Sequence, residues 1–169
     1  MVSVKICGLR ETRHIDLAHK LGVKYGGFVF YDKSPRNLEL GFGRDLLDNA
    51  PPDFVKVGLV VNPTNHLIGK LNHLNLDMLQ LHGQETKERI SEIKRLTEYP
   101  IIKAVGVEEK RDLSIVKDYA TVADQILVDA KPSKKKISLP GGNGLSFDWT
   151  ILSNNKWQFP WLLAGGLTE

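Results

Sequence analysis

Short apolar segments, mostly rich in β-branched residues, recur along this chain at nearly constant intervals. The first five intervals between their starting residues are 23 to 28 residues long and the last is 35. The predicted strands are Val2–Ile6, Gly26–Phe30, Phe54–Val60, Asp77–Leu81, Pro100–Val105, Asp124–Asp129 and Phe159–Ala164. Strands of this kind are expected in a parallel sheet whose two faces are both covered.

Amphipathic patterns of helical period lie between these strands. They predict helices at Glu11–Leu21, Thr64–Leu74, Thr86–Leu96 and Glu109–Tyr119, with a shorter candidate at Phe147–Leu152 capped by Ser146. Thr12, Thr64 and Thr86 fit N-cap or first-turn positions, and Gly22 fits the residue that closes the first helix. Strands that alternate with such helices define the α/β class.

An open doubly wound sheet and a closed (β/α)8 barrel both satisfy this alternation. The segment after the first strand, Cys7-Gly8-Leu9-Arg10, is not a dinucleotide-binding glycine motif, and the chain contains no P-loop. Polar or reactive residues instead follow several different strands, which is typical of a TIM barrel. They are Cys7, Ser34-Pro35-Arg36, Gln80, His82, Asp129 and Gly165-Gly166. We therefore predict a barrel.

The chain has too few residues after its seventh predicted strand for a complete barrel. Only Gly165 to Glu169 follow that strand, whereas a barrel of about 250 residues uses roughly 30 for each strand-helix unit. The prediction is a single barrel domain over residues 1–169 that holds about seven of the eight strands and is incomplete at its C-terminus.

Composition excludes several function classes. The 23 basic and 20 acidic residues give a net charge of only +3, so neither nucleic acid nor a membrane surface is an expected partner. No apolar run is long enough to span a bilayer. The single cysteine cannot form an internal disulfide, which favours a cytoplasmic location.

Three side chains are candidates for chemistry, and each also has a structural interpretation. Cys7 could be a small core residue, although its place at the end of a strand weakens that interpretation. Asp129 ends an apolar strand, where an inward carboxylate is costly unless it is paired or used. Arg36 could be a surface residue, but its fixed donors suit a carboxylate or a phosphate.

The glycine clusters and histidines are less specific. Gly141-Gly142-Asn143-Gly144 could cradle an anion or form a flexible turn, and Gly165-Gly166 has the same ambiguity. Four of the five histidines fall on predicted helices, and His82 lies at a strand end. No histidine or cysteine cluster has the spacing of a metal site, so no metal is predicted.

Seven blocks together resemble the phosphoribosylanthranilate isomerase family, in the order in which that family carries them. These blocks are Lys5-Ile6-Cys7-Gly8-Leu9, Gly27 to Tyr31 with Lys33-Ser34-Pro35-Arg36, Val57 to Asn62, Leu79 to Glu85, Asp129-Ala130-Lys131, Pro140 to Trp149, and Leu163 to Leu167. The resemblance implies a (β/α)8 barrel enzyme of tryptophan biosynthesis. Its reaction would be an Amadori rearrangement of N-(5-phosphoribosyl)anthranilate that needs no cofactor.

The resemblance also implies roles for individual residues. Cys7 matches the family's general base, Asp129 its general acid, and Arg36 the residue that holds the anthranilate carboxylate. Gly142, Gly144, Gly165 and Gly166 match substrate-binding positions, and only part of the family's phosphate site is present. The implied partner is the small phosphosugar-anthranilate substrate, and the complete protein is expected to be a monomer.

Two other hypotheses stay open at this stage. The chain could be a noncatalytic anion-binding or assembly fragment that another chain completes. It could also be another phosphosugar barrel enzyme, such as an indole-glycerol-phosphate synthase or a pentose-phosphate epimerase. Those enzymes depend on strand-end lysines or metal ligands, which the strand ends of this chain do not supply.

Overall fold

The computed structural model describes residues 2–131, 147–153 and 155–167. Seven strands form one sheet in which every neighbouring pair is parallel and the order follows the sequence, from β1 to β7. The strands are β1 Lys5–Cys7, β2 Tyr25–Val29, β3 Val55–Val60, β4 Met78–Leu81, β5 Ile101–Val107, β6 Gln125–Ala130 and β7 Trp161–Leu163. All seven predicted strands are confirmed, with ends that shift by a few residues.

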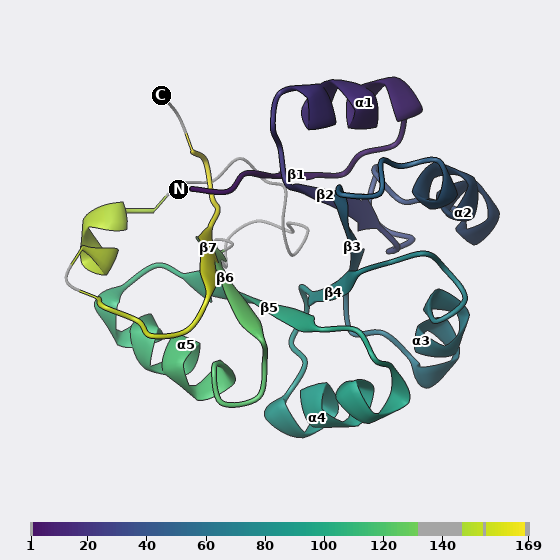
Figure 1. The fold of residues 1–169 in the computed structure, drawn as a ribbon. Coiled ribbons are helices and arrows are strands. Elements are labelled where there is room, and N and C mark those ends of the chain that lie inside the picture. The colour runs from purple at the N-terminus through teal and green to yellow at the C-terminus, as the bar shows by residue number, and fades with distance from the viewer. Residues whose placement is uncertain (1, 132–146, 154, 168–169) are drawn as a thin grey trace.

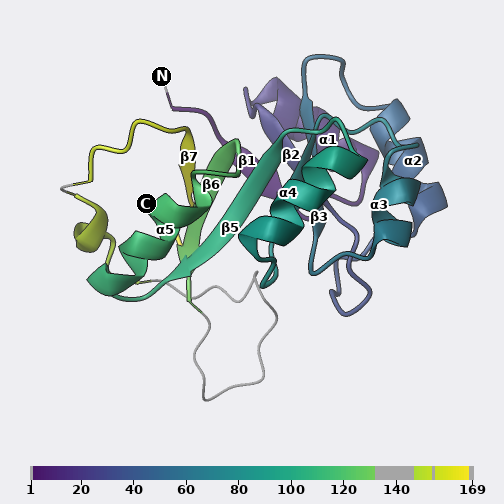
Figure 2. The same cartoon turned by 90° about the horizontal axis from the view of Figure 1, so that it is seen from below.

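The sheet curls so that its helices lie outside it, as Figure 1 shows looking along the strands. The α-helices are α1 Thr12–Lys20, α2 Leu40–Asp48, α3 Asn65–Leu71, α4 Lys87–Leu96 and α5 Leu113–Tyr119. Two 3-10 helices, η1 Lys110–Asp112 and η2 Trp149–Leu152, precede α5 and β7. Figure 2 shows α4 and α5 packed along the outer side of β5. This is the architecture of a (β/α)8 barrel with seven of its strands in the described residues.

The predicted caps at Thr64, Thr86 and Gly22 are confirmed, whereas α3 ends at Leu71, three residues before the predicted Leu74. The hydroxyl oxygens of Thr64 and Thr86 accept hydrogen bonds from the backbone N–H groups of Leu67 and Arg89, both at 3.2 Å. Gly22 follows α1 with a φ of +78°, and its N–H donates to the carbonyl of His19. Asp148, rather than Ser146, caps the helix before β7, and Ser146 lies outside the described residues.

Helix α2 is not predicted by the sequence pattern. Its sequence contains Gly41 and Gly43, and glycine lowers helix propensity by about 1 kcal/mol relative to alanine. Gly43 is required by packing, because a Cβ there would lie 2.8 Å from the ring of Phe30. Leu46 and Leu47 bury the inner face of the helix. Tertiary packing therefore forms a helix that local propensity disfavours.

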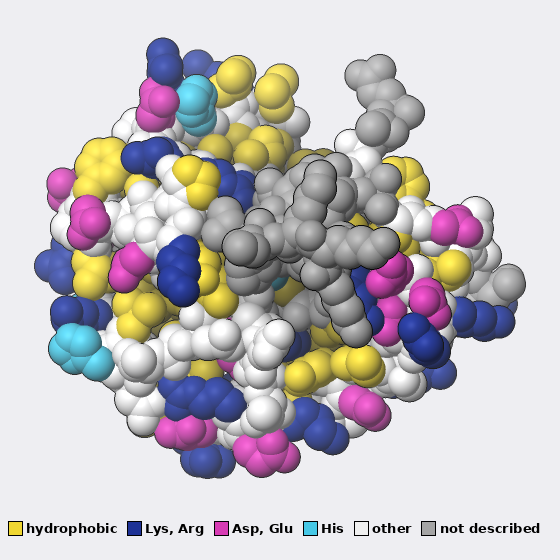
Figure 3. Space-filling model, turned by 180° about the vertical axis from the view of Figure 1, so that it is seen from behind, with side chains coloured by type: hydrophobic (Ala, Val, Ile, Leu, Met, Phe, Trp, Pro, Cys, Tyr) yellow, Lys and Arg dark blue, Asp and Glu magenta, His cyan; other side chains and the backbone are white. Residues whose placement is uncertain are grey.

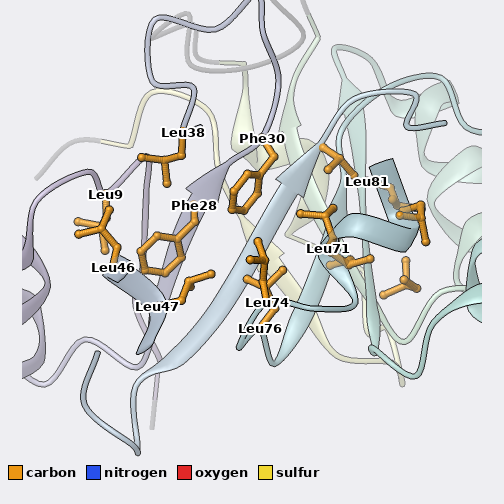
Figure 4. Packing of buried hydrophobic residues seen from close by; sticks show 14 of the residues in the cluster. Leu9, Phe28, Phe30, Leu38, Leu46, Leu47, Leu71, Leu74, Leu76 and Leu81 are labelled. Atoms are coloured by element: carbon orange, nitrogen blue, oxygen red, sulfur yellow. The ribbon is translucent and has the colours of Figure 1, made fainter. Parts of the chain in front are cut away.

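The hydrophobic core lies on both faces of the sheet. Outside the sheet, leucine and phenylalanine side chains of the strands interdigitate with those of the helices, as Figure 4 shows around Phe28, Leu47 and Leu71. A second outer cluster joins β5 and β6 to α5 and η2. Inside the curled sheet a third cluster of buried hydrophobic side chains comprises Val57, Met78, Ile102, Ala104 and Leu127. Alternate residues of each strand thus point inward and outward.

Charged side chains of both signs lie on the surface of the molecule. On the face shown in Figure 3, basic and acidic side chains of the described residues are interspersed. Within the part of the chain that is described, no helix has the length and apolar character needed to cross a membrane.

Candidate active site at the carboxyl ends of the strands

The parallel sheet brings the carboxyl ends of its strands to one rim. Cys7 is the last residue of β1 and pairs in register with Gly27 of β2, while Asp129 lies near the end of β6 and pairs with Gly106 of β5. Because all strands run in the same direction, both side chains lie at the end where barrel enzymes carry their active sites.

The Asp129 carboxylate has partners from two elements. Its Oδ1 accepts a hydrogen bond from the backbone N–H of Ala130 at 2.8 Å. Its Oδ2 lies 3.3 Å from Nε2 of His82, and both side chains are largely buried, with 16% and 11% exposure. The inward-facing carboxylate of Asp129 is therefore paired, because burying an unpaired carboxylate is costly.

Gln80 fixes the orientation of the His82 ring. Nε2 of Gln80 lies 2.8 Å from Nδ1 of His82. If the amide donates here, Nδ1 is the acceptor and the ring proton sits on Nε2, where it faces the Asp129 carboxylate. Oε1 of Gln80 is buried and has no hydrogen-bond partner among the residues that the structure describes. Residues 80 and 82 share one side of the strand because side chains alternate.

The Cys7 thiol is half buried and closely packed. A Cβ on Gly27 would lie 3.0 Å from both Cα and Sγ of Cys7, so glycine at this neighbouring position leaves room for the sulfur. The backbone N–H groups of Gly8 and Leu9 both donate to the carbonyl of Gly27, at 2.8 and 3.0 Å. These bonds fix the point where β1 ends and its thiol meets the rim.

Arg36 lies beside the end of β1. Its Nη1 donates to the carbonyl oxygen of Cys7 at 3.0 Å, and its backbone N–H donates to Oγ of Ser34 at 3.2 Å. Gly8 has a φ of +88°, and a side chain there would collide with Cδ of Arg36. Nη1 of Arg10 also donates to the carbonyl of Pro35, which ties the loops after β1 and β2 together.

The predicted glycines divide into two groups. Gly165 and Gly166 form the turn after β7 and have φ values of +90° and +59°. A Cβ on Gly165 would lie 2.7 Å from the backbone nitrogen of Ala130 and 3.1 Å from Oδ1 of Asp129, so this turn packs directly on the acidic strand end. Gly142 and Gly144 lie outside the described residues.

Other features of the site were only partly anticipated. The sequence predicts Gln80 and His82 as strand-end residues but assigns them no role. Their spacing of two residues is the sequence signal that they act together, because it places both side chains on the same side of a strand. No group of three or more metal-ligating side chains lies within the described ranges. The site thus offers a thiol, a paired carboxylate and a guanidinium, which are groups suited to proton transfer and to anion binding.

A curled parallel sheet with a thiol and a carboxylate at the ends of different strands defines the class of barrel enzymes that act by acid/base chemistry. Within this class the comparisons are specific. The model of the N-(5'phosphoribosyl)anthranilate (PRA) isomerase family matches residues 4–169. The chain belongs to this family. The resemblance seen in the sequence is thereby confirmed.

Individual relatives agree with the family match. The N-(5'-phosphoribosyl)anthranilate isomerase of Paracoccus denitrificans is 49% identical over 168 residues, which are 99% of this chain and 78% of that protein. That of Cereibacter sphaeroides is 48% identical, with 99% and 79% covered. Among solved structures, the phosphoribosyl anthranilate isomerase of Thermotoga maritima is similar at a TM-score of 0.85 and 32% identity, over 99% of this chain and 78% of that one.

Proposed function

We propose that Cys7 and Asp129 carry the reaction for which the family is named. The chain is an isomerase of tryptophan biosynthesis that converts N-(5-phosphoribosyl)anthranilate to 1-(2-carboxyphenylamino)-1-deoxyribulose 5-phosphate. A similar structure, at 31% identity and a TM-score of 0.82, is that of a phosphoribosyl anthranilate isomerase in complex with reduced 1-(o-carboxyphenylamino)-1-deoxyribulose 5-phosphate. The family match over residues 4–169 carries the conclusion.

In the proposed first step Asp129 acts as the general acid. It gives its proton to the ring oxygen of the ribofuranose, the bond between that oxygen and C1 breaks, and a Schiff base forms between C1 and the anthranilate nitrogen. The carboxylate that remains is stabilised by the N–H of Ala130 and by the Nε2 side of the His82 ring, which already face its two oxygens.

In the second step Cys7 acts as the general base. Its thiolate removes the proton from C2, the electron pair moves into a C1–C2 double bond, and the Schiff-base nitrogen becomes neutral. Tautomerisation of the resulting enolamine, with a proton added at C1, gives the ketose. The sequence of proton transfers changes no oxidation state overall and needs no cofactor.

We assign substrate binding to a charged side chain and to the backbone N–H groups of glycines around Cys7 and Asp129. Arg36 holds the anthranilate carboxylate, for which its planar fork of donors is suited. The turn at Gly165 and Gly166 offers backbone N–H groups to the phosphate beside the acidic strand end. Gly142 and Gly144 are proposed to contribute in the same way. The partner is thus a small phosphosugar, and we propose that the complete protein acts as a monomer in the cytoplasm.

Steady-state turnover of N-(5-phosphoribosyl)anthranilate, followed by the loss of its fluorescence, tests this assignment. We expect Cys7→Ala and Asp129→Asn each to lower kcat by about 10²- to 10⁴-fold, because each removes one proton-transfer group. Asp53→Asn is the control, since this exposed carboxylate pairs with His19 of α1 just before β3 begins, at the opposite end of the sheet from Cys7 and Asp129. Near-normal activity of either variant would contradict the role assigned to that residue. Product binding without turnover by the native chain would favour the noncatalytic alternative.

A further inference from the structure

A buried ion pair lies on the outer side of the sheet, away from the thiol and the carboxylate. Nζ of Lys103 in β5 is 2.8 Å from Oε2 of Glu85, and the two side chains are only 2% and 1% exposed. Lys103 points outward because its neighbours along the strand, Ile102 and Ala104, belong to the inner cluster. The proposed chemistry uses neither residue.

The ammonium group of Lys103 holds the backbone on both sides of His82. It donates to the carbonyl oxygen of Gly83 at 2.7 Å and to that of Leu81 at 3.3 Å. These are the two residues that flank His82 in the chain. The one cation therefore fixes the position and direction of the segment that carries the histidine.

The Glu85 carboxylate completes this arrangement. Its Oε1 accepts from the backbone N–H of Asn62 at 2.7 Å, and both of its oxygens are within 3.1 Å of the N–H of Gly83. The Asn62 side chain in turn accepts from the N–H of Gln84 at 2.8 Å. The segment from Leu81 to Glu85 is thus tied by hydrogen bonds to the turn after β3 and to β5.

A role in stability alone explains this pair poorly. Burial lowers the pKa of Lys103, and the neighbouring Glu85 carboxylate only opposes that effect. Removing two charges from water costs so much that a buried ion pair is often no more stable than an apolar pair of the same volume. The pair does orient the backbone beside His82, because three of its hydrogen bonds are made to the backbone of Leu81 and Gly83.

We propose that Lys103 and Glu85 are positioning residues that hold His82 against Asp129 from the outer side of the barrel. The inference rests on the proposed role of Asp129 as the general acid. His82 meets Oδ2 of Asp129 at 3.3 Å, and Gln80 fixes the other ring nitrogen. Loss of the ammonium frees the carbonyls of Leu81 and Gly83, so the His82 ring loses its fixed distance from the acid.

The chain provides a matched control in Lys56. This lysine is also buried, at 5% exposure, and also projects outward from the sheet. Its ammonium pairs with Asp77 at 3.7 Å and with Asn75 at 3.1 Å, before β4 begins and so at the opposite end of the sheet from His82. Lys56→Met therefore removes a buried paired lysine without touching the loop after β4.

The first measurement compares Lys103→Met with Lys56→Met in steady-state kinetics. Lys103→Met should lower kcat about ten- to hundredfold and change KM by less than about threefold, because a displaced catalytic geometry affects the reaction more than ground-state binding. Lys56→Met should keep kcat within about twofold. Glu85→Gln/Lys103→Met removes both charges, so it should recover folding stability without recovering kcat. It also serves if Lys103→Met does not fold.

The second measurement does not depend on turnover. In the ¹⁵N-labelled protein, Asp129→Asn should shift the Nε2 resonance of His82. The size of this shift should fall by more than about half when Asp129→Asn is combined with Glu85→Gln/Lys103→Met. It should be unchanged when Asp129→Asn is combined with Lys56→Met. An equal shift in all backgrounds, or equal kcat losses for the two lysines, would overturn the positioning role. An active Asp129→Asn variant would instead overturn the acid assignment and leave the resonance result to decide the positioning.

Discussion

The two strand ends that carry the proposed acid and base are built differently. At β6, Asp129 has the N–H of Ala130 on one oxygen and the His82 ring on the other, with Gln80 and the loop after β4 behind that ring. At β1, no hydrogen bond within the described residues fixes the Cys7 thiol. Only its backbone is held, through the carbonyl that accepts from Arg36 and through the bonds that Gly8 and Leu9 make to β2.

This difference follows from what the two groups have to do. An acid that leaves a carboxylate behind benefits from donors that are already in place, since preorganised dipoles need no rearrangement during the reaction. A thiolate carries its charge on a large sulfur atom, so the end of β1 must leave room for that atom. The glycine at position 27 supplies that room, because any Cβ there would press on Cys7.

Crowding the thiol is the stronger way to test this comparison. Gly27→Ala places a Cβ 3.0 Å from Cα and Sγ of Cys7, which is tighter than ordinary contact. We expect kcat to fall by roughly 30-fold with KM changed much less, because about 1 Å of misplacement can cost up to a hundredfold. Gly41→Ala is the matched control, as a Cβ there meets nothing within 4 Å. Equal kcat values for the two variants would show that the thiol tolerates displacement.

Removing Arg36 tests the binding side of the same strand end and should have a smaller effect. Arg36→Ala should raise KM about tenfold and lower kcat less, because a contact made in both ground and transition states contributes to binding alone. Arg10→Ala serves as the control, since Arg10 ties the same loop through the carbonyl of Pro35. An unchanged KM for Arg36→Ala would argue against the carboxylate assignment, and equal effects of both variants would assign Arg36 to loop order.

Much of this architecture could be predicted from the sequence because the signals are local. The apolar strands, the threonine caps and the strand-end positions of Cys7 and Asp129 depend on residues close together in the chain. Helix α2 was missed because Gly41 and Gly43 disfavour a helix locally, while the contact of Gly43 with Phe30 that favours it is made between separate elements.

The polar networks were missed for the same reason. Lys103 interrupts an apolar strand, and its partner Glu85 lies 18 residues earlier on another loop. The contact between His82 and Asp129 is made between the ends of β4 and β6, so no pattern of residues close together in the chain predicts it. The alternation of side chains along a strand predicts that Gln80 and His82 lie on the same face of the sheet. That this face meets Asp129 follows only from the curling of the sheet, which brings β4 and β6 together.

The most direct test of the proposed chemistry uses the single cysteine of the chain. Native chain is treated with iodoacetamide, and the fraction of Cys7 alkylated, measured by mass spectrometry, is compared with the remaining turnover of N-(5-phosphoribosyl)anthranilate. We predict that turnover falls in proportion to alkylation and that the product 1-(2-carboxyphenylamino)-1-deoxyribulose 5-phosphate slows the modification. Full turnover by completely alkylated chain would contradict the account, because the base would then lie elsewhere.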